Sequence, residues 1–471
     1  MNRLTILLLV FCVLAMVVYP SGKADVFQFL DEEAAVEMDT ALFEVVTETM
    51  KPVCKLTYDT DQQSSHPVFK SIRRSGAAFS PDGRYFAITP CTNLGFETYL
   101  LDLKTGKTRK YFRASQTPVV PSLSTPVAFS SDSRRLTFMA NNRIVVWDIP
   151  HGEEVCRIPL EIIRSEYAID QNVYSLRFSE DGNKLMGVFW SVGTVWDIES
   201  QGAVLQSFGS QSFGSHDAPF DFFHCYPNLS HAMIFTSNKE KLLLRDLATN
   251  EDVERTFNYC FLTGYGIRNF LSKKVFSNDF HFFAHEISNP DNKGGSRLLV
   301  WDAATGNDIC TIPLGYKLTA FTFLPGCNTL VTACDPNPEI EFVQARNLHI
   351  PDTSPKIDSH IPHATPDRKP VAQTETRAII EFWDIDELIW HKEKVNLFPR
   401  KIKTCYLEGN DDILDMVASP DGKMLFMRSG NRVAGNTTAY GYIFSLDPDN
   451  PPDLPAEIQL NDQAIAMPEN P

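Results

Sequence analysis

Short apolar runs alternate with polar turns along most of the chain, and one stretch shows the pattern clearly. Residues 297–314 read RLLVWDAATGNDICTIPL. An apolar run ends in a Trp-Asp pair, a polar turn with a glycine follows, and a second apolar run begins. β-branched and aromatic residues in such runs favour strands. Taken alone, this stretch predicts a β-hairpin.

The same hairpin recurs along the sequence in seven copies. When the copies are aligned on the Trp-Asp pair, its aspartate position is occupied by Asp102, Asp148, Asp197, Asp246, Asp302, Asp384 and Ser445. Four copies keep the tryptophan, as Trp147, Trp196, Trp301 and Trp383. Self-similarity of this kind indicates a repeat architecture. We expect these tryptophans and aspartates to be structural repeat residues rather than a substrate-binding platform.

A second hairpin precedes each copy and is built around a Ser-Pro-Asp-Gly-like turn. Examples are AAFSPDGRYFAI, which starts at Ala77, and MVASPDGKMLFM, which starts at Met416. Asp begins a type I turn, and Gly accepts the positive φ that closes it. Each repeat unit therefore contains four strands, two around this turn and two around the Trp-Asp hairpin.

Tandem four-stranded units with Trp-Asp pairs resemble the WD40-type (WD40/YVTN repeat-like) β-propeller family. The resemblance covers residues 51–447, and the chain is similar to a divergent exported member. It implies an all-β fold, a seven-bladed β-propeller of four-stranded antiparallel blades. The last repeat is followed by the proline-rich DPDNPPDLPAE, which disfavours a fourth strand. We therefore expect the N-terminal segment KPVCKLTYD, residues 51–59, to complete blade seven and close the ring.

The cysteines add a test of this register. Cys54, Cys156, Cys310 and Cys405 occupy equivalent places on predicted fourth strands. Different blades hold these places apart, so the four are not expected to pair with each other. The spacing of the ten cysteines shows neither CxxC nor a metal-binding pair.

The N-terminus has the layout of a secretory signal peptide, which we place at residues 1–24. Arg3 precedes an apolar run from Leu4 to Tyr19, and small residues follow. An uncleaved membrane anchor is the alternative. The mature chain is therefore expected to be exported, periplasmic or extracellular, with no membrane span and as a monomer.

Composition and charge restrict the partners. The chain is 43% hydrophobic with a formal net charge of -16, so it is globular and disfavours nucleic acid. Residues 25–50 carry acids and no base, and predict a helical or disordered spacer. Residues 448–471 form a proline-rich acidic C-terminal tail.

Three consecutive blades carry long insertions between their second and third strands, and these are the candidate interaction loops. They span residues 286–297, 335–377 (the long blade-six insertion) and 429–439. Their candidate residues are Asn292, Arg297, Arg346, His349, His360, His363, Arg432 and Asn436. A functional interpretation is a wall over a binding surface, and the alternative is drift in tolerated loops. Prolines around His360 and His363 argue against a metal site there.

No catalytic motif was found, and no catalytic, cofactor-binding or metal-binding residue is predicted. The His281 and His285 pair is interpreted as core or channel-lining. The leading hypothesis is an exported, non-enzymatic scaffold that mediates protein–protein interaction through one loop-rich face. The alternative is a propeller enzyme or small-ligand binder, quinoprotein-like or lactonase-like, with its site at the mouth of the central channel.

Overall fold

The structure is a computed structural model of the whole chain. All described residues belong to one compact unit. They are residues 46–58, 76–89, 91–92, 95–113, 126–140, 143–159, 173, 175–189, 192–209, 222–225, 231–236, 241–247, 249, 251–256, 274–277, 281–287, 297–303, 307–314, 316–335, 376–390, 397–408, 412–430 and 439–460. The predicted signal peptide lies outside them. Within these ranges, no helix has the length and apolarity needed to cross a bilayer.

The described strands form seven sheets, which we call blades one to seven. Blade one contains β3 (Ala77–Phe79), β4 (Tyr85–Ile88), β5 (Cys91–Thr92), β6 (Gly95–Asp102) and β7 (Lys107–Arg113). Blade two contains β8 (Ala128–Phe129), β9 (Arg135–Ala140), β10 (Arg143–Asp148) and β11 (Glu153–Pro159). Blade three contains β12 (Ser175–Phe178), β13 (Lys184–Val188), β14 (Val192–Asp197) and β15 (Ala203–Gly209). Blade four contains β16 (Phe222–Cys225), β17 (His231–Thr236), β18 (Lys241–Asp246) and β19 (Asp252–Thr256).

The remaining blades are built in the same way. Blade five contains β20 (Lys274–Phe276), β21 (Phe282–Ile287), β22 (Arg297–Asp302) and β23 (Asp308–Pro313). Blade six contains β24 (Lys317–Phe323), β25 (Thr329–Asp335), β26 (Thr376–Trp390), β27 (Leu397–Glu408) and β1 (Val46–Thr49). Blade seven contains β28 (Asp412–Ala418), β29 (Met424–Gly430), β30 (Ala439–Ser445), β2 (Cys54–Tyr58) and β31 (Glu457–Leu460).

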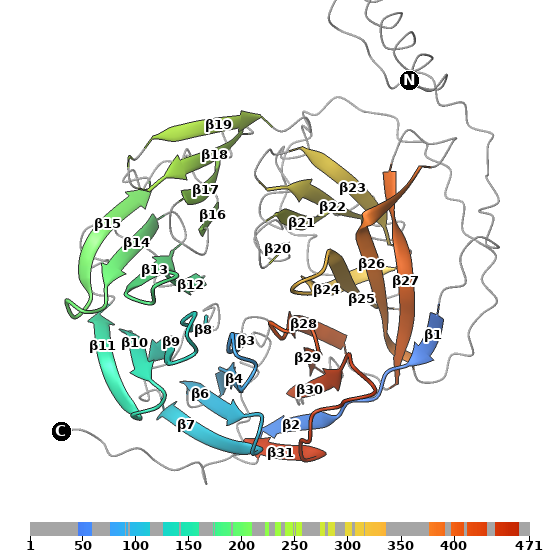
Figure 1. Cartoon of the computed structure of the whole chain (residues 1–471), viewed down its shortest axis with the longest axis horizontal. Coiled ribbons are helices and arrows are strands. Elements are labelled where there is room, and N and C mark those ends of the chain that lie inside the picture. Colours follow the sequence, from blue (N-terminus) through green and yellow to red (C-terminus); the bar gives the residue numbers. More distant parts are fainter. Residues whose placement is uncertain are drawn as a thin grey trace, which may run out of the picture. The chain divides into compact units, whose positions relative to one another are not determined.

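The blades surround a common axis, with the first strand of each blade nearest that axis and the last strand outermost (Figure 1). First strands of neighbouring blades contact each other, as β28 and β24 do with one another and as β3 does with both β28 and β8. Successive strands of each repeat pair antiparallel. The predicted all-β, seven-bladed propeller is confirmed.

Blade seven is closed as the sequence predicts. β2, from the N-terminal segment, pairs antiparallel with β30, and Cys54 lies opposite Ile443. Cys54 and Leu56 are fully buried and pack with Phe86 of blade one and Phe426 of blade seven. The closing strand therefore joins the last blade to the first through one hydrophobic cluster.

Two further strands were not predicted from the sequence. β1 pairs parallel with β27, so the interpretation of residues 25–50 as a helical or disordered spacer is wrong for its described end, 46–49. Residues 25–45 lie outside the described residues. Val and Thr in β1 favour an extended backbone, and the next residue, Met50, is buried against blade six.

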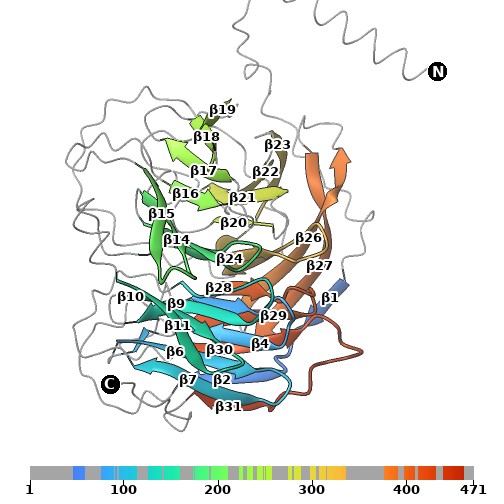
Figure 2. The same ribbon diagram turned by 60° about the vertical axis from the view of Figure 1, so that its left-hand side comes forward.

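The C-terminal tail contributes the second extra strand. β31 pairs parallel with β2, so blade seven continues to residue 460 rather than ending at 447. The strand begins only after the last proline of the segment, Pro455, because proline lacks the N–H that a ladder needs. Ile458 and Leu460 are buried in the cluster between blades seven and one. Figures 1 and 2 both show β1 beside β27 and β31 beside β2.

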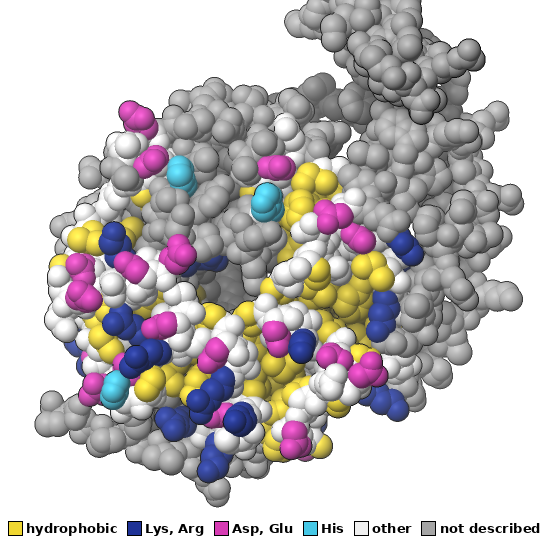
Figure 3. Space-filling view, viewed as in Figure 1, with side chains coloured by type: hydrophobic (Ala, Val, Ile, Leu, Met, Phe, Trp, Pro, Cys, Tyr) yellow, Lys and Arg dark blue, Asp and Glu magenta, His cyan; other side chains and the backbone are white. Residues whose placement is uncertain are grey.

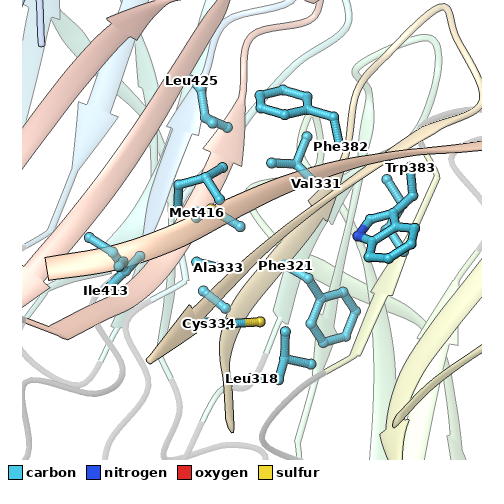
Figure 4. Close-up of a cluster of buried hydrophobic side chains, with 14 of the residues drawn as sticks. Leu318, Phe321, Val331, Ala333, Cys334, Phe382, Trp383, Ile413, Met416 and Leu425 are labelled. Carbon is cyan, nitrogen blue, oxygen red and sulfur yellow. The ribbon is translucent and has the colours of Figure 1, made fainter. Parts of the chain in front are cut away.

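Hydrophobic packing between neighbouring blades forms the core. The largest described cluster runs through blades five, six and seven. Figure 4 shows its blade-six side chains Leu318 and Phe321 together with Ile413 and Met416 of blade seven. Burying such faces between blades is the main favourable contribution to folding here.

The repeat tryptophans Trp147, Trp196, Trp301 and Trp383 are buried and pack against the second strand of their own blade. Trp383 donates its Nε1–H to Thr332 Oγ1 at 3.1 Å. Lys401 lies over the Trp383 ring and pairs with the buried Glu381 at 2.6 Å. In blade three the equivalent neighbour of Trp196 is Gly187, and a Cβ there would lie 2.7 Å from Trp196 Cη2.

This contact predicts a specific coupling. Gly187→Ala is expected to destabilise the fold by about 1–3 kcal/mol through overpacking. Trp196→Phe removes the outer ring atoms and is expected to cost about 2 kcal/mol through the cavity it leaves. Together the two changes should cost about 1 kcal/mol less than their sum, measured by denaturant unfolding. Strictly additive costs would show that the glycine does not make room for the indole.

Cys54, Cys156, Cys310 and Cys405 lie on strands of four different blades, and no disulfide joins any two of them, as predicted. All four are buried. Burial raises the pKa of Cys54 and of Cys156 to about 11, and that of Cys310 to about 12. The thiolate is the reactive form, so these outer-strand thiols are poor nucleophiles and resist disulfide exchange.

Candidate functional site

The antiparallel blades give the propeller two different faces. The turn face, as we define it, carries the connections between first and second strands and between third and fourth strands. The loop face carries the connections between second and third strands and from each blade to the next. Successive strands alternate in direction, so the two sets of connections are always on opposite faces. Both faces are candidates for binding.

Most first turns of the turn face share one hydrogen-bonded unit. In blade one, Ser80 Oγ accepts from the Tyr85 amide at 2.8 Å and donates to Asp82 Oδ1 at 2.5 Å, which in turn accepts from the Arg84 amide at 3.0 Å. The same unit is built by Ser130 and Asp132, by Ser179 and Asp181, and by Ser419 and Asp421.

Asp181, the aspartate of this unit in blade three, is held as a carboxylate. The hydrogen bond from Ser179 and the backbone amide of Asn183 lower the pKa of Asp181. A carboxyl group whose pKa is lowered in the folded protein stabilises the fold at pH values above its unfolded pKa, and that stabilisation is lost as the pH falls through its folded pKa. The first turn of blade three therefore contributes to stability at neutral pH and weakens in acid.

The repeat aspartates organise the second set of turns. Asp102 Oδ1 accepts from the backbone amides of Lys104 and Thr105 at 3.0 and 3.2 Å. Equivalent bonds join Asp148 to the amide of His151, Asp197 to that of Ser200, Asp246 to that of Thr249 and Asp384 to that of Asp386. These residues close hairpins, in the manner of Asx turns. Asp302 lies at the same strand end in blade five.

Neighbouring turns are also bonded to each other. The Asp82 amide of blade one donates to Ser133 Oγ of blade two at 3.0 Å. Arg135 of blade two donates to the Gly182 carbonyl of blade three at 2.7 Å. Ser131 Oγ donates to the Glu180 carbonyl across the same boundary. The turn face of blades one to three is thus a connected, rigid surface.

Charges of both signs cover this part of the molecule. Figure 3 shows acidic and basic side chains interspersed, with Lys and Arg gathered over the sector of blades one and two. Arg84 pairs with Asp102 at 3.1 Å and lies over the Tyr85 ring. Among the described residues of this sector, acidic side chains therefore lie among the basic ones and offset part of their charge.

Only one of the predicted interaction residues lies in the described part of the chain. Arg297 is exposed at the start of β22, at its loop-face end. The others, Asn292, Arg346, His349, His360, His363, Arg432 and Asn436, lie outside the described residues. Their insertions run between Ile287 and Arg297, between Asp335 and Thr376, and between Gly430 and Ala439. All three leave the loop face from neighbouring blades five, six and seven.

The inner strands carry charges that the sequence reasoning missed. Asp415 on β28 lies 3.7 Å from the buried Arg428 guanidinium on β29. Burial raises the pKa of the Asp415 carboxyl, while Arg428 opposes that shift. Lys317 and Asp335 lie opposite each other on β24 and β25 of the next blade. A charged residue inside an apolar run, as in DILDMVA, was the available sequence signal.

The described residues do not assemble these charges into a metal site. Among them, no three His, Cys, Asp or Glu side chains lie close enough to hold an ion. His285 is buried beside Trp301, with ring centroids 4.9 Å apart, as a core histidine. His281 is exposed immediately before β21, so it is not a core residue. Its backbone carbonyl accepts a hydrogen bond from the amide of Ala303, which follows the third strand of blade five.

Three solved WD40 structures are similar to this chain at low sequence identity. No family model and no curated protein matches this chain. Among solved structures, the Pan2 WD40 domain of Neurospora crassa is 12% identical, over 87% of this chain and 100% of that chain, with a TM-score of 0.48. The RRP9 WD40 repeats are 9% identical, over 84% and 94%, with a TM-score of 0.45. The Cps50 (Swd1) β-propeller domain of Myceliophteria thermophila is 12% identical, over 79% and 96%, at 0.46.

At these sequence identities and TM-scores, the similarity adds no evidence for the fold beyond the strand topology. The repeated Trp-Asp hairpins, the order of strands in seven sheets and the closing strand from the N-terminus define the class of protein on their own. The chain has the fold of a WD40-type β-propeller.

One turn departs from the repeat in its backbone. Ser133 has φ of 61°, at the place where the equivalent Ser-Asp turns have Gly83, Gly182 and Gly422. A left-handed conformation costs a residue with a Cβ about 1–2 kcal/mol. The Ser133 hydroxyl accepts the inter-blade hydrogen bond from the Asp82 amide. The hydrogen bond that Ser133 accepts between the blades therefore offsets the cost of its left-handed backbone conformation.

Two variants separate these effects. Ser133→Ala removes the hydrogen bond and keeps the strain, whereas Ser133→Gly removes both. We expect Ser133→Gly to be more stable than Ser133→Ala by about 1 kcal/mol in denaturant unfolding. Gly182→Ala is the reverse control, because its Cβ would meet Ser130 only at an ordinary 3.7 Å, so strain alone should cost about 1 kcal/mol. Equal stability of the two Ser133 variants would contradict the strain argument.

Proposed function

We propose that this chain is a non-enzymatic scaffold that binds protein partners on its loop face. The observation that carries the proposal is the difference between the two faces. Turns on the turn face are short and hydrogen-bonded, whereas three consecutive blades send long connections from one sector of the loop face. Binding surfaces are commonly built from loops that a rigid scaffold positions.

The charge of the chain favours a protein over the other macromolecular partners. A formal net charge of -16 repels nucleic acid phosphates and anionic lipid head groups. A neutral or basic protein surface carries no such penalty. No described residue set favours the alternative of an enzyme or ligand site at the channel mouth.

The test is affinity capture from the native medium or envelope with mass spectrometry. Wild-type chain is compared with a deletion of residues 337–372 and with the turn-face variant Arg134→Glu/Lys184→Glu. Because the deletion removes only loop-face sequence, partners enriched by the wild type should fall by about ten-fold or more, whereas the turn-face variant should retain them.

The outcomes are distinguishable once each variant is shown to melt like the wild type. Equal partner lists for the wild type and the deletion would remove the loop face from the proposal. Loss of partners only in Arg134→Glu/Lys184→Glu would move the binding site to the turn face. No protein enriched over a resin control would contradict the scaffold itself.

We also propose that the chain is exported. The support is the apolar run from Leu4 to Tyr19 behind Arg3, followed by small residues. The buried, high-pKa thiols are compatible with an oxidising compartment, because exchange with a disulfide requires an accessible thiolate.

Export is checked by fractionation and by mass spectrometry of the mature N-terminus. We expect the protein in the exported fraction, beginning near residue 25. Leu8→Arg/Leu9→Arg should hold the chain inside the cell, because charges interrupt the apolar run that the export machinery recognises. A chain that keeps Met1 and stays in the cytosol would refute export, and one that keeps it in the membrane fraction would support the anchor.

A further inference from the structure

The outermost strand of each blade exposes backbone groups at its free edge, and most of these edges are protected. β7 (KTRKYFR), β11 (EEVCRIP) and β19 (DVERT) carry several charges. β23 (DICTIP) ends in proline after an initial aspartate. β27 and β2 are covered by the added strands β1 and β31. Charges, prolines and covering strands are the usual means of preventing edge-to-edge association.

β15 of blade three is different. Its sequence, AVLQSFG, contains neither a charge nor a proline. It pairs with β14, and no strand among the described residues pairs with its outer edge. Figure 1 shows β15 at the perimeter of the ring. Of the described outer strands, β15 alone lacks every one of these protections.

The side chains of β15 are also apolar where they are most exposed. Val204 and Leu205 keep 51% and 50% of their surface accessible, the highest values among the large hydrophobic residues of the described ranges. Leu205 is the extra residue of a β-bulge, because Gln206 lies opposite Val195 and Val204 lies opposite Trp196. Val204 and Leu205 therefore place apolar surface beside the free edge, where an added strand would cover it.

This molecule already accepts added strands at equivalent edges. β31 adds to β2 with four residues in register, and buries Ile458 and Leu460 in doing so. β1 adds to β27 in the same way. Outer edges of these blades therefore have the twist and access that strand addition requires.

We propose that two copies of this chain associate through β15, pairing antiparallel around a two-fold axis so that the two third blades form one continuous sheet. A second β15 fits this edge because it is uncharged, so no like charges meet across the pair. It also supplies matching exposed apolar side chains, Val204 and Leu205, beside the edge. A two-fold interface is self-complementary by construction, since the same strand serves both partners. The sequence alone predicted a monomer, and the open edge is the reason for the change. The inference does not rest on the proposed function.

The test is sedimentation equilibrium of the full chain over a range of concentrations. The wild type should show a monomer–dimer equilibrium. Leu205→Lys places two lysines close together across the two-fold axis and should weaken dimerisation by about ten-fold or more. Val204→Lys should do the same, because Val204 is the other exposed apolar residue beside this edge. Ile402→Lys is the matched control, because Ile402 is an exposed apolar residue, 40% accessible, on β27, whose outer edge is covered by β1. It should leave the dimer intact.

A charge-complementation arm separates pairing from any general effect of a charge. Leu205→Lys and Leu205→Glu chains should each be monomeric and should associate when mixed. Circular dichroism melts verify that each variant folds. A wild type that stays monomeric at its highest soluble concentration, or a dimer unaffected by both lysine variants, would overturn the proposal. Equal loss with Ile402→Lys would overturn it as well.

Discussion

The pairing of β2 with β30 is the interaction on which the rest of the structure depends. A ring of sheets buries its hydrophobic faces only between neighbours, so a gap at one position exposes two faces at once. β2 closes that gap with Cys54 and Leu56, which reach the cluster shared by blades seven and one. β31 then adds to β2 and brings Ile458 and Leu460 into the same cluster. Segments from both ends of the chain therefore secure the joint between blades seven and one.

Much of this architecture could be predicted because the residues that form the turns recur in each repeat. The Ser-Pro-Asp-Gly turns and the Asp of each Trp-Asp pair have short polar side chains that hydrogen-bond nearby amides, and such bonds depend only on local sequence. The closing strand was also predictable, since the segment KPVCKLTYD matched the other fourth strands. Equivalent cysteines on four outer strands followed from the same register, and their burial agrees with it.

The parts that could not be predicted depend on contacts between distant segments. β1 follows an acidic segment and β31 follows several prolines, so the local composition disfavoured strands in both places. Each becomes a strand because an outer edge offers a ladder of unpaired groups, which is a tertiary effect. The buried Glu381 and the Asp415–Arg428 pair are tolerated for a similar reason, since their partners come from other strands. For the candidate interaction residues, Arg297 alone can be compared with the prediction, and it lies at the loop-face end of its strand.

The difference between the constrained turn face and the variable loop face follows from the hydrogen bonds in the turns. A turn whose amides are hydrogen-bonded by Ser80 and Asp82, or by Asp102, can change little without breaking these bonds. The connections of the loop face have no such unit at the described strand ends, and their lengths differ widely between blades. Entropy penalises a longer loop only weakly, so insertions accumulate where no turn unit would be broken. The loop face is therefore free to vary in length and chemistry while the turn face keeps the blades in register, and this asymmetry lets one fixed scaffold present a variable surface.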